Sequence, residues 1–528
     1  MLVLSYLILQ IVTLSALSQQ CNVRVTSSGR VCVCNSTYCD FEPKWKPVAG
    51  HYSLYTTSKE RPGFSVKTNE FSYNRFNSEY WTVQVDVKAK KQKILGWGGA
   101  FTDATGINIH QLPQGAQDNL LRSYFGEDGV DYSLCRVPIG GTDFSTRPYS
   151  YDDHLDGVGL PNFKLQEEDK DHKIPVIEAA KKLKGGNSLK LFATAWTAPP
   201  WMKTNNGWTG FGRLKDEFYQ LWADYHVKFF EAYRQNGIEF WGMTTGNEPS
   251  LGFVPNFLSK LNAMSWMSFR MNKWVGDNLG PTIRSSNFSH LKIMLHDDIK
   301  VTLPVLRTQL RNPTTVDFAD GVAVHWYWEK LLPDSVLDLT VSPLKDLLLL
   351  ATEASNGYLH GLRLEKAVEL GSWPRAVNYI KSIFLVSPTE TDKPKHQHKF
   401  QDISYRSAGW IDWNMVLDQD GGPCYINNNL DAPIIINSAA GEFYKQPMFY
   451  ALGHFAKFCP PDSTILENKI GWRLENIQAM SCLRPDDSLA VFLFNSGDRN
   501  VSLFVSDGKR VVEETVEADS INTFLWSL

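Results

Sequence analysis

The sequence predicts a closed (β/α)8 barrel joined to an all-β sandwich that is built from both ends of the chain. The first observation is a series of eight apolar segments separated by stretches with helical spacing. The second is a period-two alternation of apolar and polar residues on either side of that series. The third is a group of four cysteines near the N-terminus, which predicts a small disulfide-bonded region.

Eight segments have the near-continuous apolar composition of strands that are buried on both faces. They are Lys93–Gly98, Tyr132–Ile139, Leu189–Trp196, Ile238–Thr245, Leu291–His296, Gly321–Trp326, Leu347–Thr352 and Ala408–Trp413. Helices are expected between them; for example, Trp222, Tyr225 and Phe229 recur at helical spacing before Gly237. This β-α order assigns residues 92–445 to the barrel.

Both ends of the chain have the pattern of sheet. Trp81, Val83, Val85 and Val87 alternate with polar residues, as in a strand with one solvated face. Four short strands are expected near the C-terminus, at Leu489–Phe494, Val501–Val505, Val511–Val516 and Ile521–Trp526. Residues 44–91 and 446–528 are therefore assigned to a β-sandwich.

Residues 1–18 form an apolar run that ends with small residues at Ala16 and Ser18, which is typical of a cleaved secretory signal. No later stretch has the apolar length of a membrane span, so we expect a luminal or secreted protein. The net charge of −4 and pI near 6.3 give no basic surface, which argues against a nucleic-acid partner.

A luminal or secreted protein meets an oxidising environment, in which neighbouring cysteines tend to form disulfides. In residues 19–43, two disulfides are favoured over a zinc site, and pairing of near neighbours favours Cys21–Cys32 and Cys34–Cys39 among three possible connectivities. Cys135 is expected to be a buried thiol, Cys459–Cys482 is a possible local bridge, and Cys424 is undecided. Glycosylation sequons begin at Asn35, Asn287 and Asn500.

A polar, proline-bearing segment at residues 386–401 interrupts the approach to the eighth strand. One interpretation is a surface loop. The other is a retained intron that the gene model translates, because Val386-Ser387 and Phe400-Gln401 are dipeptides that splice-junction sequences can encode. The transcript sequence across this segment distinguishes the two.

Two strands of the barrel end in a glutamate. Glu248 follows the fourth predicted strand just before Pro249, and Glu353 ends the seventh. Two carboxylates at the C-terminal ends of barrel strands are what a retaining glycosidase uses as acid/base and nucleophile. The alternative is that both are ion-paired or helix-capping residues. No metal or cofactor is expected, because His296 and His325 do not belong to a set with ligand spacing.

Several motifs together give the chain a specific resemblance. It resembles the glucosylceramide-hydrolysing members of glycoside hydrolase family 30 over nearly the whole length after residue 30. Removing residues 386–401 also brings the spacing before Trp410 into line with the family. The motifs that carry the resemblance are Gly98–Asp103, Asp143–Ser145, Trp201–Thr204, Thr244–Pro249, His325–Tyr327, Glu353–Ala354 and Gly409–Asn414.

The resemblance implies a small disulfide-bonded N-terminal sheet, a sandwich from both chain ends and a catalytic barrel. It implies Glu248 as acid/base and Glu353 as nucleophile, with Tyr327 and Arg136 beside the carboxylates. The family's sugar contacts fall on Asp143, Trp196, Asn247, Trp413 and Asn429. From the residues alone, Asp143 is equally an Asx-turn residue, Asn247 a strand-end cap, and either tryptophan a packing residue.

The resemblance further implies glucosylceramide at a membrane surface as the substrate, in the lysosomal lumen. The family also relies on anionic lipid and a saposin-type activator. Two alternatives remain open: a family-30 hydrolase acting on another β-linked glycan or xyloside, and a catalytically inactive binding or trafficking homologue.

Overall fold

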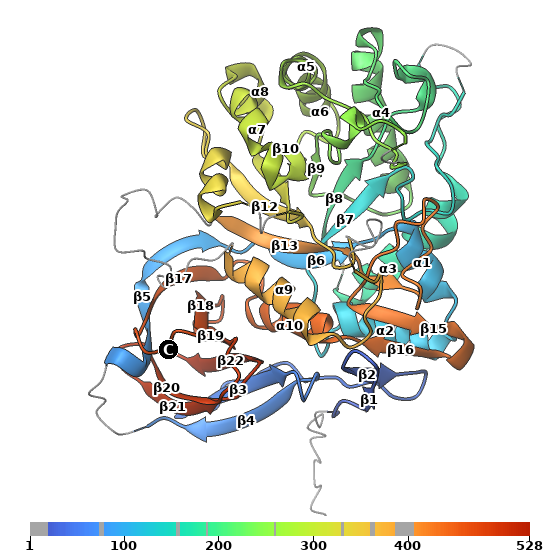
Figure 1. Cartoon of the computed structure of the whole chain (residues 1–528). Coiled ribbons are helices and arrows are strands. Elements are labelled where there is room, and N and C mark those ends of the chain that lie inside the picture. Colours follow the sequence, from blue (N-terminus) through green and yellow to red (C-terminus); the bar gives the residue numbers. More distant parts are fainter. Residues whose placement is uncertain are drawn as a thin grey trace, which may run out of the picture.

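The computed structural model describes residues 19–72, 79–154, 159–185, 188–257, 260–328, 332–358, 365–385 and 406–528. The expected signal sequence and the 386–401 segment lie outside the described residues. Figure 1 shows a barrel, a sheet module at its side, and a smaller sheet that includes the two N-terminal strands. In the described part of the chain, no helix has the length and apolar character needed to cross a membrane.

Parallel strands close into a barrel in the order β6-β7-β8-β9-β10-β11-β12-β13, with β13 pairing back to β6. Their bounds are β6 Gly96–Ala100, β7 Leu134–Ile139, β8 Lys190–Ala195, β9 Gly242–Thr244, β10 Lys292–Ile299, β11 Gly321–His325, β12 Leu348–Glu353 and β13 Ser407–Asn414. This confirms the predicted (β/α)8 barrel and its strand order. The fourth strand is shorter than predicted, because residues 238–240 pair with no neighbouring strand and Glu239 is exposed between buried Ile238 and Phe240.

Helices surround the barrel (Figure 1). Their bounds are α1 Asp103–His110, α2 Gln114–Phe125, α3 Ile174–Leu183, α4 Tyr219–Gln235, α5 Ser268–Trp274, α6 Gly280–Ser285, α7 Leu303–Leu310, α8 Pro313–Phe318, α9 Trp373–Leu385 and α10 Pro447–Phe458. The apolar stripe predicted for α4 is the side that packs, since Trp222, Tyr225 and Phe229 are all buried. Gly237 follows the helix with φ of 73°, a left-handed conformation that favours glycine.

The sandwich is one nine-stranded sheet whose strand order is β21-β20-β5-β17-β18-β19-β22-β3-β4. The bounds are β3 His51–Ser58, β4 Ser65–Glu70, β5 Thr82–Lys93, β17 Thr464–Ile470, β18 Ile477–Leu483, β19 Ser488–Asn495, β20 Val501–Ser506, β21 Val511–Val516 and β22 Ser520–Ser527. Residues from its two ends share a core that includes Leu54, Val505 and Phe524. The strands predicted at both ends of the chain therefore meet in one module.

The small sheet contains more of the chain than the sequence predicted. Its order is β1-β2-β16-β15-β14, with bounds β1 Val23–Val25, β2 Arg30–Cys34, β16 Glu442–Lys445, β15 Ile434–Asn437 and β14 Val416–Leu417. Residues 416–445 were assigned to the barrel, but three of their strands extend this sheet. Each is only two to four residues long, too short for the alternation pattern to predict it.

The cysteines pair as the sequence favoured. Disulfides join Cys21 to Cys32 and Cys34 to Cys39, and a third joins Cys459 to Cys482. Cys135 is a buried free thiol and Cys424 is a half-buried one. The bridge from Cys459 connects the end of α10 to β18 of the sandwich.

Helices α9 and α10 lie between the barrel and the sandwich (Figure 1). The indole nitrogen of Trp97 in β6 donates to the carbonyl of Cys459, just after α10, at 2.7 Å. Phe455 of α10 packs against Trp97 of the barrel on one side and Phe492 of β19 on the other. This shared packing joins the two modules along a buried surface.

Candidate active site

Two barrel strands deliver the two glutamates to the same end of the barrel. Glu353 is the last residue of β12, and Glu248 lies four residues after β9. The backbone of Glu248 is left-handed, with φ of 38°, and its N–H donates to the carbonyl of Asp297 at 2.9 Å. A glutamate in this strained conformation is held by its surroundings, which is common at functional sites.

The two carboxyl groups lie within bonding range of one substrate atom. One oxygen of Glu248, one of Glu353 and one ring nitrogen of His325 all lie within 4.8 Å of one another. Retaining glycosidases hold their two carboxyl groups about 5 to 5.5 Å apart, whereas inverting enzymes need about 6.5 to 9.5 Å. The spacing therefore fits double displacement.

The Glu353 carboxylate is buried and accepts hydrogen bonds from neighbouring side chains. The Tyr327 hydroxyl donates to Oε1 at 2.9 Å, and Arg136 Nη1 donates to Oε2. Burial raises the pKa of the Glu353 carboxyl, whereas the positive charges of His325 and Arg136 oppose that rise. Its ionised form therefore depends on these two neighbours.

His325, the last residue of β11, bridges two carboxylates. Its Nδ1 lies 2.9 Å from Glu248 Oε1, and its Nε2 lies 3.1 Å from Asp297 Oδ1. Burial acts to lower the pKa of His325, but the charges and hydrogen bonds of Glu353, Asp297 and Glu248 raise it to about 10. The ring is therefore an imidazolium that donates from both nitrogens.

Asp297 holds the charged groups together from below the cavity. Its Oδ2 accepts from Arg136 at 2.8 Å and from Thr244 at 2.7 Å, while its Oδ1 accepts from Thr352 at 2.6 Å. Burial acts to raise the pKa of Asp297, but Arg136 and His325 lower it well below its usual range. Asp297 is thus a fixed buried anion that orients Arg136 and His325.

Asp297 was not predicted from the sequence as a site residue, and neither was the role of His325. The backbone of His296 and Asp297 is left-handed, with φ of 79° and 55°, where the register of β10 shifts. This bulge turns Asp297 under the site. A carboxylate pair at the end of an apolar strand was the available signal, but the bulge that aims it was not predictable.

A cavity of about 210 Å³ opens above the two glutamates. Its lining includes polar and aromatic side chains from Asp143, Trp196, Asn247, Tyr327, Trp413 and Asn428. The same lining also includes the apolar or aromatic side chains of Leu251, Leu261, Ile299, Trp328, Tyr358 and Leu430. The rings of Trp196 and Trp413 stack with centroids 4.9 Å apart, and the Arg136 guanidinium lies over both.

The predicted site residues come together here, except for Asn429. Arg136 lies beneath the cavity, where its Nη2 donates to Asn247 at 2.8 Å. Asn428, rather than Asn429, lines the cavity and donates to Asp143 at 3.3 Å. The Asn429 side chain donates to the carbonyl of Asp420 instead. Asp143 lines the same cavity as the two glutamates, and its contact with a sugar stays a prediction.

Asp143 is buried in the lining of the cavity. Burial raises its pKa to about 7, and the charge of Glu353 adds to the shift, while the hydrogen bond from Asn428 opposes it. A carboxyl with this pKa changes charge near neutrality, so its capacity to accept a hydrogen bond from a sugar hydroxyl depends on pH.

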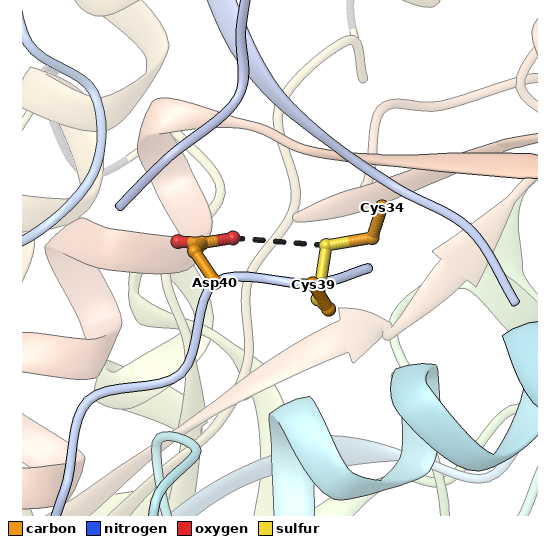
Figure 2. Close-up of side chains that lie close together, drawn as sticks. All are labelled: Cys34, Cys39 and Asp40. Atoms are coloured by element: carbon orange, nitrogen blue, oxygen red, sulfur yellow. Dashed lines mark hydrogen bonds between the residues drawn. A yellow bond between two sulfur atoms is a disulfide. The ribbon is translucent and has the colours of Figure 1, made fainter. Parts of the chain in front are cut away.

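Among the residues that the structure describes, two groups have the donor types of a metal site. The first group consists of Glu248, His325 and Glu353. Its carboxylate oxygens already face Arg136 and the protonated imidazole of His325. Cys34, Cys39 and Asp40 are the other (Figure 2). There the two sulfur atoms are bonded to each other and are not thiolates. Neither group offers the free anionic donors that a resident cation needs.

Comparisons with known proteins agree with this geometry. The "Glycosyl hydrolase family 30 TIM-barrel domain" matches residues 94–459, and the "Glycosyl hydrolase family 30 beta sandwich domain" matches residues 462–524. The chain is 36% identical to "Putative glucosylceramidase 4" of Caenorhabditis elegans, across 97% of this chain and 96% of that one. It is 36% identical to "Lysosomal acid glucosylceramidase" of Mus musculus, across 94% of each chain.

A solved structure has the same fold. SrfJ from Salmonella typhimurium superposes with a TM-score of 0.79 and 22% identity, covering 90% of this chain and 100% of that one. At this identity the likeness extends to the fold alone. Two family models that together match most of the chain, and relatives of matching length, show that the chain belongs to glycosyl hydrolase family 30.

Proposed function

We propose that this protein is a retaining β-glucosidase that hydrolyses glucosylceramide to glucose and ceramide by double displacement. The observation that carries the proposal is the pair Glu248 and Glu353, held within 4.8 Å of each other in one cavity. The similarity to curated glucosylceramidases over nearly the whole chain supports the choice of substrate.

In the first step Glu353 attacks the anomeric carbon, and the bond from that carbon to the ceramide oxygen breaks. Glu248 donates its proton to that oxygen, which leaves as an alcohol. Because the His325 imidazolium donates to Oε1 of Glu248, the transferable proton is on Oε2. Tyr327 and Arg136 keep the Glu353 oxygens directed at the sugar.

In the second step a water attacks the glucosyl-Glu353 ester. Glu248, now ionised, accepts the proton of that water, and Glu353 leaves as a carboxylate. Two displacements at one carbon restore its configuration, so the product is β-glucose. Asn247, held by Arg136, is positioned for a contact to the 2-hydroxyl, where hydrogen bonds strengthen in the transition state.

The lining of the cavity is suited to a glycolipid. Asp143 and Asn428 are hydrogen-bonding groups for sugar hydroxyls, while the stacked Trp196 and Trp413 contribute aromatic surface to the cavity wall. Leu251, Ile299 and Trp328 are apolar or aromatic residues of the same lining, which suits the start of a ceramide chain. Such a substrate places the reaction at a membrane surface in the lysosomal lumen, with anionic lipid and a saposin-type activator as expected partners.

The test compares hydrolysis of glucosylceramide, galactosylceramide and a xylan by the full chain, with anionic lipid present or absent. Glucosylceramide should be preferred, and Glu353→Gln should remove turnover by about 10⁴-fold or more while the protein stays folded. Preference for the xylan would favour another β-glycan hydrolase. Labelling of Glu353 by a glucose-configured epoxide excludes an inactive homologue.

A second experiment tests the roles of the two glutamates. Azide should restore activity to Glu248→Ala, because a small anion can attack the glucosyl-enzyme without a general base. The product should be β-glucosyl azide, identified by NMR. An α-configured product would contradict double displacement.

A further inference from the structure

A second cavity lies on the sandwich, apart from the active site. Its volume is about 570 Å³, and it is lined by Trp81, Asn476, Asn495, Gly497, Asp498, Arg499, Asn500, Val501, Ser502 and Phe504. An aromatic ring among amide, hydroxyl and carboxylate side chains has the character of a sugar-binding groove. None of these residues belongs to the catalytic barrel.

Aromatic side chains are unusually exposed beside this groove. Trp81 is 36% exposed, Tyr80 51% and Trp472 63%. Tyr80 packs edge-on against Trp472 with ring centroids 5.3 Å apart. The Arg473 guanidinium lies 5.0 Å from the Trp472 ring and 5.7 Å from the Trp81 ring, so it fixes the two indoles next to each other. An exposed apolar group of this size is expected to have an occupant.

The turn that carries Asn500 is rigid. Asn495 is fully buried; its side-chain amide donates to the carbonyls of Arg499 and Glu517 at 2.9 and 2.8 Å and accepts from Gly497 N–H at 3.0 Å. The side-chain oxygen of Asn500 accepts from the N–H of Ala518 at 3.0 Å. This bond fixes the amide plane and leaves Nδ2, the atom that carries an N-glycan, without a hydrogen bond to the described residues.

Asn500 begins an Asn-Val-Ser sequon, is exposed, and is itself part of the groove wall. A glycan attached to Asn500 would therefore begin inside the groove. We propose that Asn500 carries an N-linked glycan whose first sugars lie in this groove against Trp81, with Trp472 extending the aromatic surface outward. The apolar faces of the N-acetylglucosamine rings cover the indole, and their polar groups face Asn476 and Asp498.

The experiment uses the full chain secreted by eukaryotic cells that attach oligomannose glycans. Peptide mass spectrometry should find Asn500 occupied. Under native conditions, endoglycosidase H should release the Asn500 glycan about fivefold more slowly than the glycan at Asn287, because stacking on Trp81 protects it. Trp81→Ala should remove this protection, whereas Trp81→Phe, which keeps a ring, should retain most of it.

Asn287→Gln is the matched control, since it removes an exposed glycan from the barrel and should not change release at Asn500. An unoccupied Asn500, or release rates that Trp81→Ala leaves unchanged, would overturn the proposal. Binding of a free oligosaccharide to Trp81 while the Asn500 glycan is still attached would also overturn it, in favour of a site for external glycans. These outcomes do not depend on glucosylceramide hydrolysis.

Discussion

Asn428 and Asn429 are adjacent in the chain but have different surroundings. Asn428 lines the cavity and donates to Asp143, whereas Asn429 donates to a backbone carbonyl. We expect Asn428→Ala to lower kcat/KM for a glucoside by about 10 to 100-fold, the value of a hydrogen bond to a charged group. Asn429→Ala should change it by less than about threefold. Steady-state kinetics of the two variants check this, and equal losses would contradict it.

Arg136 also affects the pKa of the Glu353 carboxyl, and this effect can be measured as a pH dependence. It favours the ionised form of Glu353, so removing its charge raises the pKa of Glu353 and lowers the ionised fraction at acid pH. In Arg136→Gln, labelling of Glu353 by a glucose-configured epoxide should therefore require a higher pH than in the unsubstituted protein. Labelling rates measured across pH show the shift.

The substitution of Arg136 also affects stability. It removes Arg136 from the buried Asp297 carboxylate, which keeps His325 as a cationic partner, and the loss of this buried ion pair costs about 3 kcal/mol. Arg136→Lys keeps the charge and is the control for the pH effect. A labelling profile that stays in place in Arg136→Gln, in protein that circular dichroism shows to be folded, would refute the role assigned to Arg136.

At the scale of elements, two histidines join α1 to the short helical segment Glu168–Lys173. His110 ends α1, and its Nδ1 lies 3.3 Å from Nδ1 of His172. Burial lowers the pKa of His110, and His172 lowers it further. The unfolded chain therefore binds protons more readily at His110 than the folded protein does. Protonation of His110 is therefore no burden on the folded state above the unfolded-state pKa of about 6.5, and stability is lost as pH falls from there toward the folded-state pKa.

His172→Leu should therefore reduce the loss of stability between about pH 7.5 and pH 5, because it removes one member of the pair. Urea unfolding midpoints at both pH values measure the difference. His290→Leu, at an exposed histidine elsewhere on the barrel, is the control for replacing a surface histidine with leucine. An equal acid-induced loss in His172→Leu and the unsubstituted protein would contradict the prediction.

The sequence predicts elements best where burial is continuous. The β12 run is apolar up to Thr352 and Glu353, so its end and its glutamate could be placed from the pattern. The strand β14 has only two residues, and its pairing with β15 depends on contacts that no local pattern encodes. The role of His325 as a bridge between carboxylates was not predicted, because its carboxylate partners come from other strands.

At the scale of the whole molecule, the N-terminal segment is fastened to the junction between the small sheet and α10. Asp40 Oδ1 lies 2.7 Å from Lys445 Nζ, and the Tyr450 hydroxyl donates to Oδ2 of Asp40. Asp40 is also held next to the Cys34–Cys39 disulfide, with Oδ1 3.6 Å from Cys34 Sγ (Figure 2). Burial lowers the pKa of Lys445, and Asp40 opposes that change by favouring the charged ammonium.

Removing the Asp40 carboxylate should therefore weaken the attachment of the N-terminal segment to the small sheet and to α10. In Asp40→Ala the buried ammonium of Lys445 loses its partner, and we expect a loss of about 3 to 5 kcal/mol in the free energy of unfolding. Arg24→Ala breaks a more exposed ion pair, to Glu442 in the same sheet, and should cost about 1 kcal/mol or less. Urea unfolding of both variants measures the difference. Equal losses would mean that the pair with Lys445 does not hold the N-terminal segment in place, because burial is what separates the two ion pairs.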